Sequence, residues 1–325
     1  MKRVSLFLSI LLLAAAMTAF SGCGNAGRSS GDAEAKLRVV TTIFPLYDWA
    51  RELIGGREDE IELVCLLENG ADYHSFQPSA AHIARIAEAD VFIFTGGGSE
   101  AWAEEAVKNR RNPSQKAVRL FTVLEDRLLL EEHVEGMEEE HEEDNDVEYD
   151  EHLFLSLVNA KRAVSAIAGA LREADPAHKA DFEANEAAYL KKLSEMDQAY
   201  RETVQNARRD TILFGDRFPF RYLCEDYGLR YYAAFQGCSA DAEASFQTVA
   251  FLSEKVKELS LPSVLTLEKS DHKLAETIIS ASGLKGVEII TMDSMQAVTP
   301  KERSEGASYL RSMEKNLEAL RKALN

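Results

Sequence analysis

Two histidines and three carboxylates have side chains of the types that bind divalent metal ions. Four of these residues follow short apolar segments, and the fifth follows an acidic stretch. They are His74, after the segment 61–67; Asp216, after 211–215; Glu268, just after 263–267; Asp293, after 287–291; and His152, just past the acidic stretch. If the segments are strands of open parallel sheets, their carboxyl ends are where ligands collect. Imidazole and carboxylate together suit first-row ions such as zinc, manganese and iron(II). The positions therefore predict a site for such a metal.

Each of these residues also has an ordinary structural interpretation. A histidine in a loop after a strand is more often solvated or hydrogen-bonded than a metal ligand. Asp293 directly precedes Ser294 and is placed as a helix cap would be, and Glu268 has Lys269 beside it as an ion-pair partner. The chain contains no HExxH, GxSxG or P-loop motif, so spacing alone identifies no enzyme.

The segments that must position these residues alternate between two patterns. Six short apolar, β-branched segments read as buried strands, at 38–42, 61–67, 91–95, 211–215, 263–267 and 287–291. Helical patterns lie between them, which predicts α/β layers with parallel sheets.

The middle of the chain, 156–207, carries no strand signal. Its second part, 177–207, consists of good helix formers and predicts a helix of roughly 45 Å. The fold class that follows is α/β, with two α/β lobes at 37–155 and 208–325, parallel sheets, and linking helices at 156–207.

The N-terminus has the composition of an export signal. Lys2 and Arg3 precede an apolar run at 4–20, which predicts a signal peptide over 1–22. The ending Phe-Ser-Gly-Cys resembles a bacterial lipobox, which implies a lipidated Cys23, followed by a flexible tether at 23–36. The alternatives are an ordinary secreted protein and an N-terminal membrane anchor.

Three further cysteines, Cys65, Cys224 and Cys238, match no zinc-finger spacing. Outside the cytoplasm, a Cys224–Cys238 bridge and buried free thiols both remain open, and free thiols are favoured.

The charge is concentrated in one place. The 325 residues carry a formal net charge of -18, which argues against nucleic acid as a partner. Thirteen acids and no Lys or Arg lie within 131–151, and without them the charge would be -5. One interpretation is a solvated, disordered loop. The other is a weak cation trap, in which the acids act with His133 and His141 beside His152.

The sequence resembles a known family at several motifs. Residues 70–78, Gly-Ala-Asp-Tyr-His-Ser-Phe-Gln-Pro, are similar to the G-A-D-P-H-x-x-E/Q-P motif of metal-binding lipoproteins of zinc and manganese ABC importers. Residues 150–155 resemble the family's D-P-H-x-W-L, and Phe44-Pro45-Leu46 resembles part of its T-x-Y-P segment. The resemblance covers nearly all of the mature chain.

The resemblance implies a fold of two lobes joined by a long helix, with one metal at the lobe interface. It carries the first two ligands onto His74 and His152 and the last onto Asp293. The family's third ligand lies in an F-H-D-A-F-G-Y pattern, where this chain has Phe214-Gly215-Asp216-Arg217 and Gly215 takes the ligand position. Asp216 is then the nearest substitute, and Glu268 is the second.

The function that the resemblance implies is extracytoplasmic capture of a divalent metal, zinc first and manganese or iron as the alternative. The partners would be an ABC importer permease and its ATPase, and the membrane through lipidated Cys23. The protein would be a monomer that binds no nucleic acid and is not an enzyme. Two rival functions are a secreted metallohydrolase, for which no general base is recognisable, and a surface adhesion protein on the same scaffold.

Overall fold

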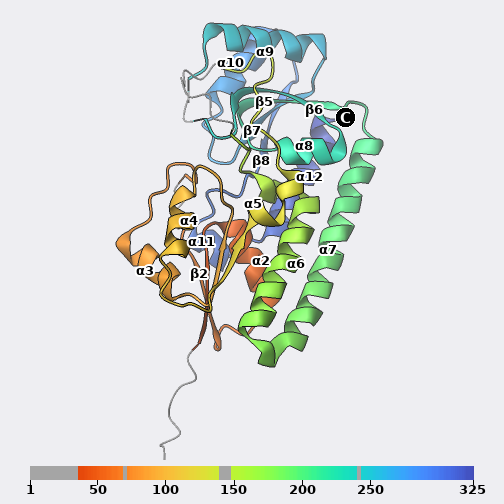
Figure 1. The fold of residues 1–325 in the computed structure, drawn as a ribbon. Helices are drawn as coiled ribbons and strands as arrows, with labels where there is room; N and C mark the ends of the chain where they lie inside the picture. The colour runs from red at the N-terminus through yellow and green to blue at the C-terminus, as the bar shows by residue number, and fades with distance from the viewer. Residues whose placement is uncertain (1–35, 69–71, 139–147, 240–242) are drawn as a thin grey trace, which may run out of the picture. The chain divides into compact units, whose positions relative to one another are not determined.

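The computed structural model describes residues 36–68, 72–138, 148–239 and 243–325. Within them two strand-and-helix lobes are joined by long helices (Figure 1). The first part contains β1 (Leu37–Thr41), α2 (Phe44–Ile54), β2 (Ile61–Cys65), α3 (Ala80–Glu88), β3 (Val91–Phe94), α4 (Ala101–Lys108), β4 (Lys116–Arg119), α5 (Leu120–Val123) and the 3-10 helices η1 (Glu125–Arg127) and η2 (Leu153–Leu155). The linking helices are α6 (Leu157–Ala174), η3 (Pro176–His178) and α7 (Lys179–Gln205). The second part contains β5 (Thr211–Phe218), α8 (Arg221–Tyr227), β6 (Arg230–Gln236), α9 (Phe246–Glu258), β7 (Ser263–Leu267), α10 (Lys273–Ser282), β8 (Glu288–Met292), α11 (Pro300–Ser304) and α12 (Tyr309–Ala323).

Each lobe is built on a four-stranded parallel sheet with the same strand order. The orders are β2-β1-β3-β4 and β6-β5-β7-β8. In the first sheet β2 lies on one side of β1 and β3 lies on the other, and in the second sheet β6 and β7 flank β5 in the same way. The strand order therefore reverses beside β1 and beside β5. Ligands of open α/β sheets bind at such reversals, beyond the carboxyl ends of the strands. The predicted fold class, two α/β lobes with parallel sheets and a long linking helix, is confirmed.

The central strands form because apolar residues are buried on both of their faces. All four residues of β3 and all five of β7 are buried, as expected when helices cover both sides of a parallel sheet. Two strands were not predicted from the sequence. The edge strand β4 has only four residues and charged ends, and β6 (Arg-Tyr-Tyr-Ala-Ala-Phe-Gln) has no β-branched residue.

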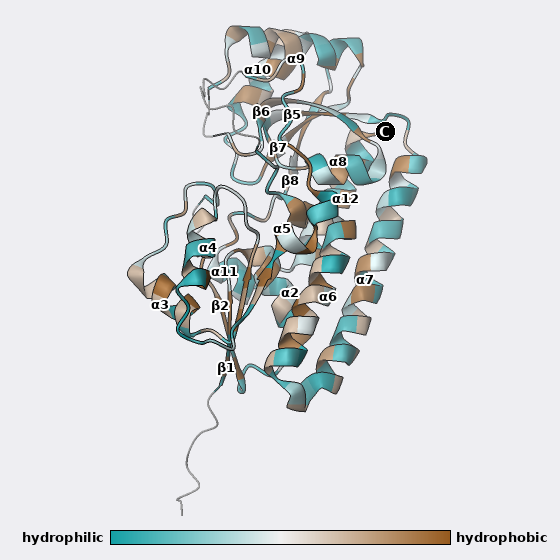
Figure 2. Cartoon of the chain, viewed as in Figure 1, coloured by the Kyte–Doolittle hydropathy of each residue, from teal (hydrophilic) through white to brown (hydrophobic). Residues whose placement is uncertain are grey.

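The linking helix α7 spans 27 residues, or about 40 Å, close to the length predicted. It lies against α6, α2 and α12. Teal prevails along α7 in Figure 2, whereas the strands carry much of the brown. The buried residues of α7 are Phe182, Tyr189, Leu193, Asp197 and Tyr200.

The hydrophobic core runs through both lobes. One cluster of buried residues includes Val39 and Trp49 near the start of the chain and Tyr309 and Leu320 near its end. The rings of Trp49 and Tyr309 lie 5.1 Å apart. The backbone N–H of Tyr309 donates to Asp48 Oδ2 at 2.8 Å, and its hydroxyl donates to the Phe154 carbonyl at 2.8 Å. Helix α12 thereby ties the second half of the chain to the first.

Several predictions concern residues that the structure does not describe. The signal peptide 1–22, Cys23, the tether up to residue 35, and His141 lie outside the described residues. Within the described part, no helix combines the length and the apolar character needed to cross a membrane. Cys65, Cys224 and Cys238 are free thiols, so the structure has no Cys224–Cys238 bridge.

Candidate metal centre

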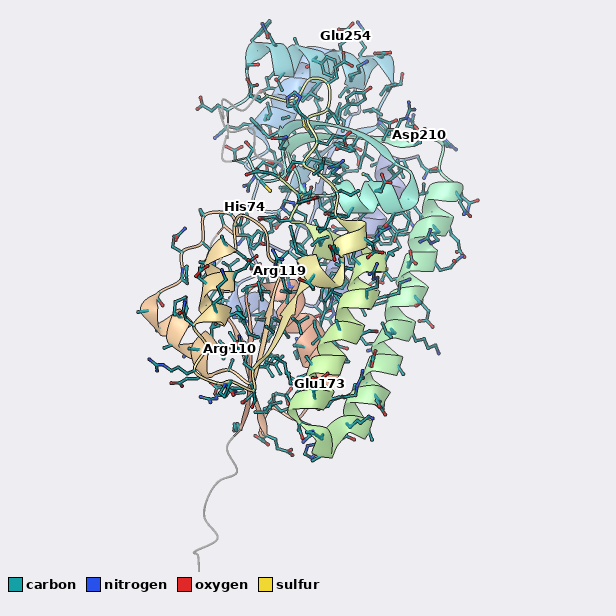
Figure 3. All side chains as sticks on the ribbon, viewed as in Figure 1. His74, Arg110, Arg119, Glu173, Asp210 and Glu254 are labelled. Carbon is teal, nitrogen blue, oxygen red and sulfur yellow. The ribbon has the colours of Figure 1, made fainter. Side chains whose placement is uncertain are left out.

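Two imidazoles face each other across a short gap. His74 lies in the loop between β2 and α3, and His152 is the residue that opens η2 (Figure 3 labels His74). Their Nε2 atoms are 3.2 Å apart, although the residues are 78 positions apart in the sequence. His152 is completely buried and the side chain of His74 is 11% exposed. The structure therefore brings together two of the five predicted metal ligands.

The other ring nitrogen of each histidine lies beside a side-chain oxygen that can accept its proton. His152 Nδ1 is 3.1 Å from Asp150 Oδ1, which also accepts the His152 backbone N–H at 2.8 Å. His74 Nδ1 is 3.0 Å from Ser99 Oγ and 3.6 Å from Glu151 Oε2. From these partners we assign the Nδ1–H tautomer to both rings. Each Nε2 then presents a lone pair to the other.

Facing lone pairs repel unless a cation lies between them. Zinc bonds to imidazole at 2.0–2.1 Å, so two nitrogens of a tetrahedral zinc site are about 3.3 Å apart. The 3.2 Å separation of the Nε2 atoms matches that edge. A carboxylate behind a metal-binding histidine is the usual way in which tautomer and ring orientation are fixed.

Glu151 supports His74 from a pocket that glycine makes possible. Its Oε1 accepts the backbone N–H of Ser99 at 2.9 Å. Gly97 has a φ of +94°, and a Cβ there would lie 2.3 Å from Oε1. The glycine run at 96–98 therefore lets a buried carboxylate approach the backbone beside His74.

The charges around the two histidines differ in effect. Burial lowers the pKa of His74, and Glu151 opposes this only in part. Burial would also lower the pKa of His152, but the carboxylates of Asp150, Glu131 and Glu151 outweigh it and raise that pKa. Burial, together with the charge of Asp150, raises the pKa of Glu131 to about 7. A cation at this place would offset a buried excess of negative charge.

A cysteine and a glutamate that the sequence analysis did not name as ligands of the metal site lie beside the pair. Cys238 follows β6, and its Sγ donates to Glu131 Oε1 at 3.0 Å. The described part of the chain contains two groups of three residues whose ligand atoms lie within 4.8 Å of one another inside the group. The groups are His74–His152–Cys238 and Glu131–Asp150–His152. Cys238 follows the carboxyl end of a strand, which is where ligands of parallel sheets collect. It was not considered as a ligand because β6 was not predicted.

None of the three predicted carboxylate ligands belongs to either group. Asp216 lies inside β5, which extends three residues beyond the predicted strand, and its Oδ2 accepts the Leu267 N–H at 3.1 Å. Glu268 accepts the N–H of Ser294 at 2.7 Å and its hydroxyl at 2.5 Å.

Asp293, the third of these carboxylates, accepts the Met295 N–H at 2.8 Å and the Ser312 hydroxyl at 2.7 Å. All three carboxylates are thus used to hold turns of the second lobe. Asp216 and Glu268 line a cavity of about 390 Å³, and Glu268 and Asp293 line another of about 430 Å³. Among the described residues, no histidine lines either cavity.

The described part of the acidic stretch is folded. Residues 129–131 and 148–150 pair across the insertion: the Glu131 N–H donates to the Glu148 carbonyl and the Asp150 N–H to the Leu129 carbonyl, both at 2.9 Å. Glu138 reaches the second lobe, where its Oε2 accepts the N–H of Ser245 at 2.7 Å at the start of α9. The end of this described part therefore packs on the second lobe, whereas His133 is exposed. Residues 139–147, which belong to the same interpretation, lie outside the described residues.

Comparison with known proteins gives a consistent family. The family model described as zinc-uptake complex component A, periplasmic, matches residues 39–323. The zinc-binding lipoprotein AdcA of Streptococcus pneumoniae strain R6 is 32% identical over 323 residues, which are 99% of this chain and 61% of the relative. The chain thus spans about 61% of the length of that relative.

A second relative and a solved structure match over nearly their full lengths. The high-affinity zinc uptake system protein ZnuA of Bacillus subtilis is 28% identical, with 97% of each chain covered. The crystal structure of the Zn(II)-bound ZnuA-like domain of S. pneumoniae AdcA has a TM-score of 0.70 and 30% identity, and the match covers 89% of this chain and 99% of that one.

Proposed function

The chain belongs to the family of periplasmic zinc-uptake component A proteins, and from this premise we propose that it captures zinc outside the cytoplasm and delivers it to an ABC importer. Zinc is the cargo of this protein and is not used in a reaction. The relatives that match it are named for zinc binding or zinc uptake. The family is one of transport components, not of enzymes.

The observation that carries the proposal is the facing pair of imidazole nitrogens. His74 Nε2 and His152 Nε2 lie 3.2 Å apart, with their Nδ1 atoms on Ser99, Glu151 and Asp150. Neutral imidazoles oriented by hydrogen bonds from behind are ligands for zinc, and they are less suited to manganese, which prefers oxygen. We therefore place the cargo between these nitrogens, with manganese and iron as the alternatives.

The partners and the location follow from the same proposal. The importer permease and its ATPase would receive the ion, and the protein would act as a monomer. The S. pneumoniae relative is named a lipoprotein, and this chain has Ser21-Gly22-Cys23 after an apolar run. We propose that Cys23 is lipidated and holds the protein at the outer face of the cell membrane.

Calorimetric titration of the mature chain with zinc and with manganese tests the function. We expect tight one-to-one zinc binding that His74→Ala and His152→Ala each weaken by more than 100-fold, since loss of an outer-shell partner alone costs about 10–100-fold. His178→Ala, at the turn between α6 and α7, is the matched control and should bind as the parent does. Unchanged zinc affinity after His74→Ala would contradict the assignment.

A further inference from the structure

We propose that Cys238 is the third protein ligand of the cargo ion, so that zinc is held by two imidazoles and one thiolate. This inference rests on the proposed function and specifies the chemistry of the same site. The Cys238 Sγ and one ring nitrogen each of His74 and His152 lie within 4.8 Å of one another. Two of these ligands come from the first lobe, and Cys238 comes from the second.

The chain that carries Cys238 is shaped to approach His152. Gly237 lies directly between the end of β6 and Cys238. A Cβ at Gly237 would lie 2.8 Å from Cε1 of His152 and 2.9 Å from the Phe218 carbonyl oxygen. Only glycine leaves room for the backbone to lie this close to the imidazole, and the following residue is then held at its edge.

The second group, Glu131–Asp150–His152, does not offer an equivalent site. Asp150 Oδ1 already accepts both His152 Nδ1 and the His152 backbone N–H. An ion there would have to replace the hydrogen bonds that orient the ring. On the opposite side, each Nε2 atom has the other Nε2 as its neighbour at 3.2 Å, and no carboxylate bond would have to be replaced by an ion. The histidine–cysteine group is therefore the one with lone pairs available.

Binding through sulfur requires the thiol proton to leave, and the structure holds an acceptor for it. The Cys238 Sγ–H donates to Glu131 Oε1 at 3.0 Å. When zinc binds, the S–H bond breaks, its proton passes to the Glu131 carboxylate and from there to solvent, and the sulfur electron pair forms the bond to zinc. Nothing is oxidised or reduced. With three protein ligands, a solvent molecule completes the tetrahedron.

A thiolate in place of carboxylates determines which ions are retained. Soft sulfur ligands favour zinc, whereas manganese prefers carboxylate and water oxygens. Asp216, Glu268 and Asp293, the carboxylates predicted to complete the site, are instead bonded within the second lobe. The site is consequently selective for zinc over manganese through Cys238.

Replacing zinc with cobalt(II) allows a bond between the metal and the Cys238 sulfur to be detected by absorption spectroscopy. We expect the cobalt-loaded mature chain to show a sulfur-to-cobalt charge-transfer band in the near ultraviolet, and X-ray absorption of the zinc form to show one sulfur at about 2.3 Å. Cys238→Ser should lose the band and bind zinc more than about 100-fold more weakly. Cys224→Ser is the matched control, because Cys224 is also a free thiol of the second lobe and belongs to neither ligand group; it should keep both properties.

A second variant separates ligation from a structural role. Cys238→Asp returns a ligand of the harder kind, so the ratio of zinc to manganese affinity should fall while manganese binding improves or holds. Equal losses for both ions in Cys238→Asp would overturn the inference. If Cys238→Ser does not fold, the presence or absence of the cobalt charge-transfer band in the parent protein still tests whether sulfur binds the ion.

The outcomes also distinguish this inference from the proposed function. Zinc binding by the parent with neither the cobalt band nor a zinc–sulfur distance overturns the role of Cys238 and leaves zinc capture intact. Absence of zinc binding by the parent protein overturns both.

Discussion

One oxygen atom of Asp150 fixes both the position and the tautomer of His152. Its Oδ1 accepts two hydrogen bonds from His152, at 2.8 Å from the backbone and 3.1 Å from Nδ1. The backbone bond fixes where the residue lies, and the ring bond fixes which nitrogen carries the proton. At the scale of single residues, the site is therefore prepared before an ion arrives.

Asp150→Asn should weaken zinc binding about 10–100-fold, the usual cost of losing an outer-shell partner. The amide can still accept the backbone N–H, but it no longer holds the proton of the ring as firmly. Zinc competition titrations measure the effect. Asp126→Asn, at an exposed ion pair with Arg162, is the control. Parental affinity in Asp150→Asn would contradict the tautomer assignment.

At the scale of elements, the ends of strands decide what the site contains. Cys238 could not be predicted because β6 is rich in alanine and aromatic residues, and its strand character comes from pairing beside β5 and burial in the second lobe. Asp216 was predicted to follow a strand but lies inside β5, because β5 continues past its apolar part. His74 and His152 could be predicted because each lies in a short sequence motif. That they come together in space followed from the predicted α/β fold of the lobes.

Two glycines on different elements give a matched test of crowding. Gly237→Ala should weaken zinc binding by at least about tenfold, because its Cβ would collide with His152 and the Phe218 carbonyl. Gly169→Ala, within α6, has no atom closer than 3.9 Å to the new Cβ and should stabilise the fold by about 0.5–1 kcal/mol with zinc binding unchanged. Denaturant unfolding and zinc titration measure both. Unaltered zinc affinity in Gly237→Ala would show that the loop yields.

At the scale of the whole molecule, the fold class, the parallel sheets and the long linking helix could all be predicted from the alternation of apolar segments. The way residues 131–138 of the acidic stretch fold could not, because their composition resembles that of a solvated loop. Buried Met137 and the bonds of Glu138 to α9 hold residues 131–138 on the second lobe. Long-range packing of this kind leaves no periodic signal in the sequence.

Glu131 makes the stability of the metal-free protein depend on pH. Its pKa is raised to about 7 from 4.5, so the folded state holds this proton more tightly than the unfolded state does. The free energy of unfolding should therefore fall as the pH rises from about 4.5 to about 7. Thermal unfolding of the metal-free protein and of Glu131→Gln across this range measures the effect. Identical slopes in the two proteins would contradict the assignment.

The core that runs from Trp49 to Tyr309 has a thermodynamic consequence. The Asp48–Tyr309 and Tyr309–Phe154 hydrogen bonds are buried between the two halves of the chain, and one core cluster draws residues from both. We therefore expect each half to lose the packing of this shared cluster when the other melts. The described part should unfold as one cooperative unit, with a single calorimetric peak whose enthalpy equals the van't Hoff value. Two separable peaks would disprove this. An ion bound between the lobes would then raise that one midpoint for both, so the melting temperature itself reports how much of the protein is loaded.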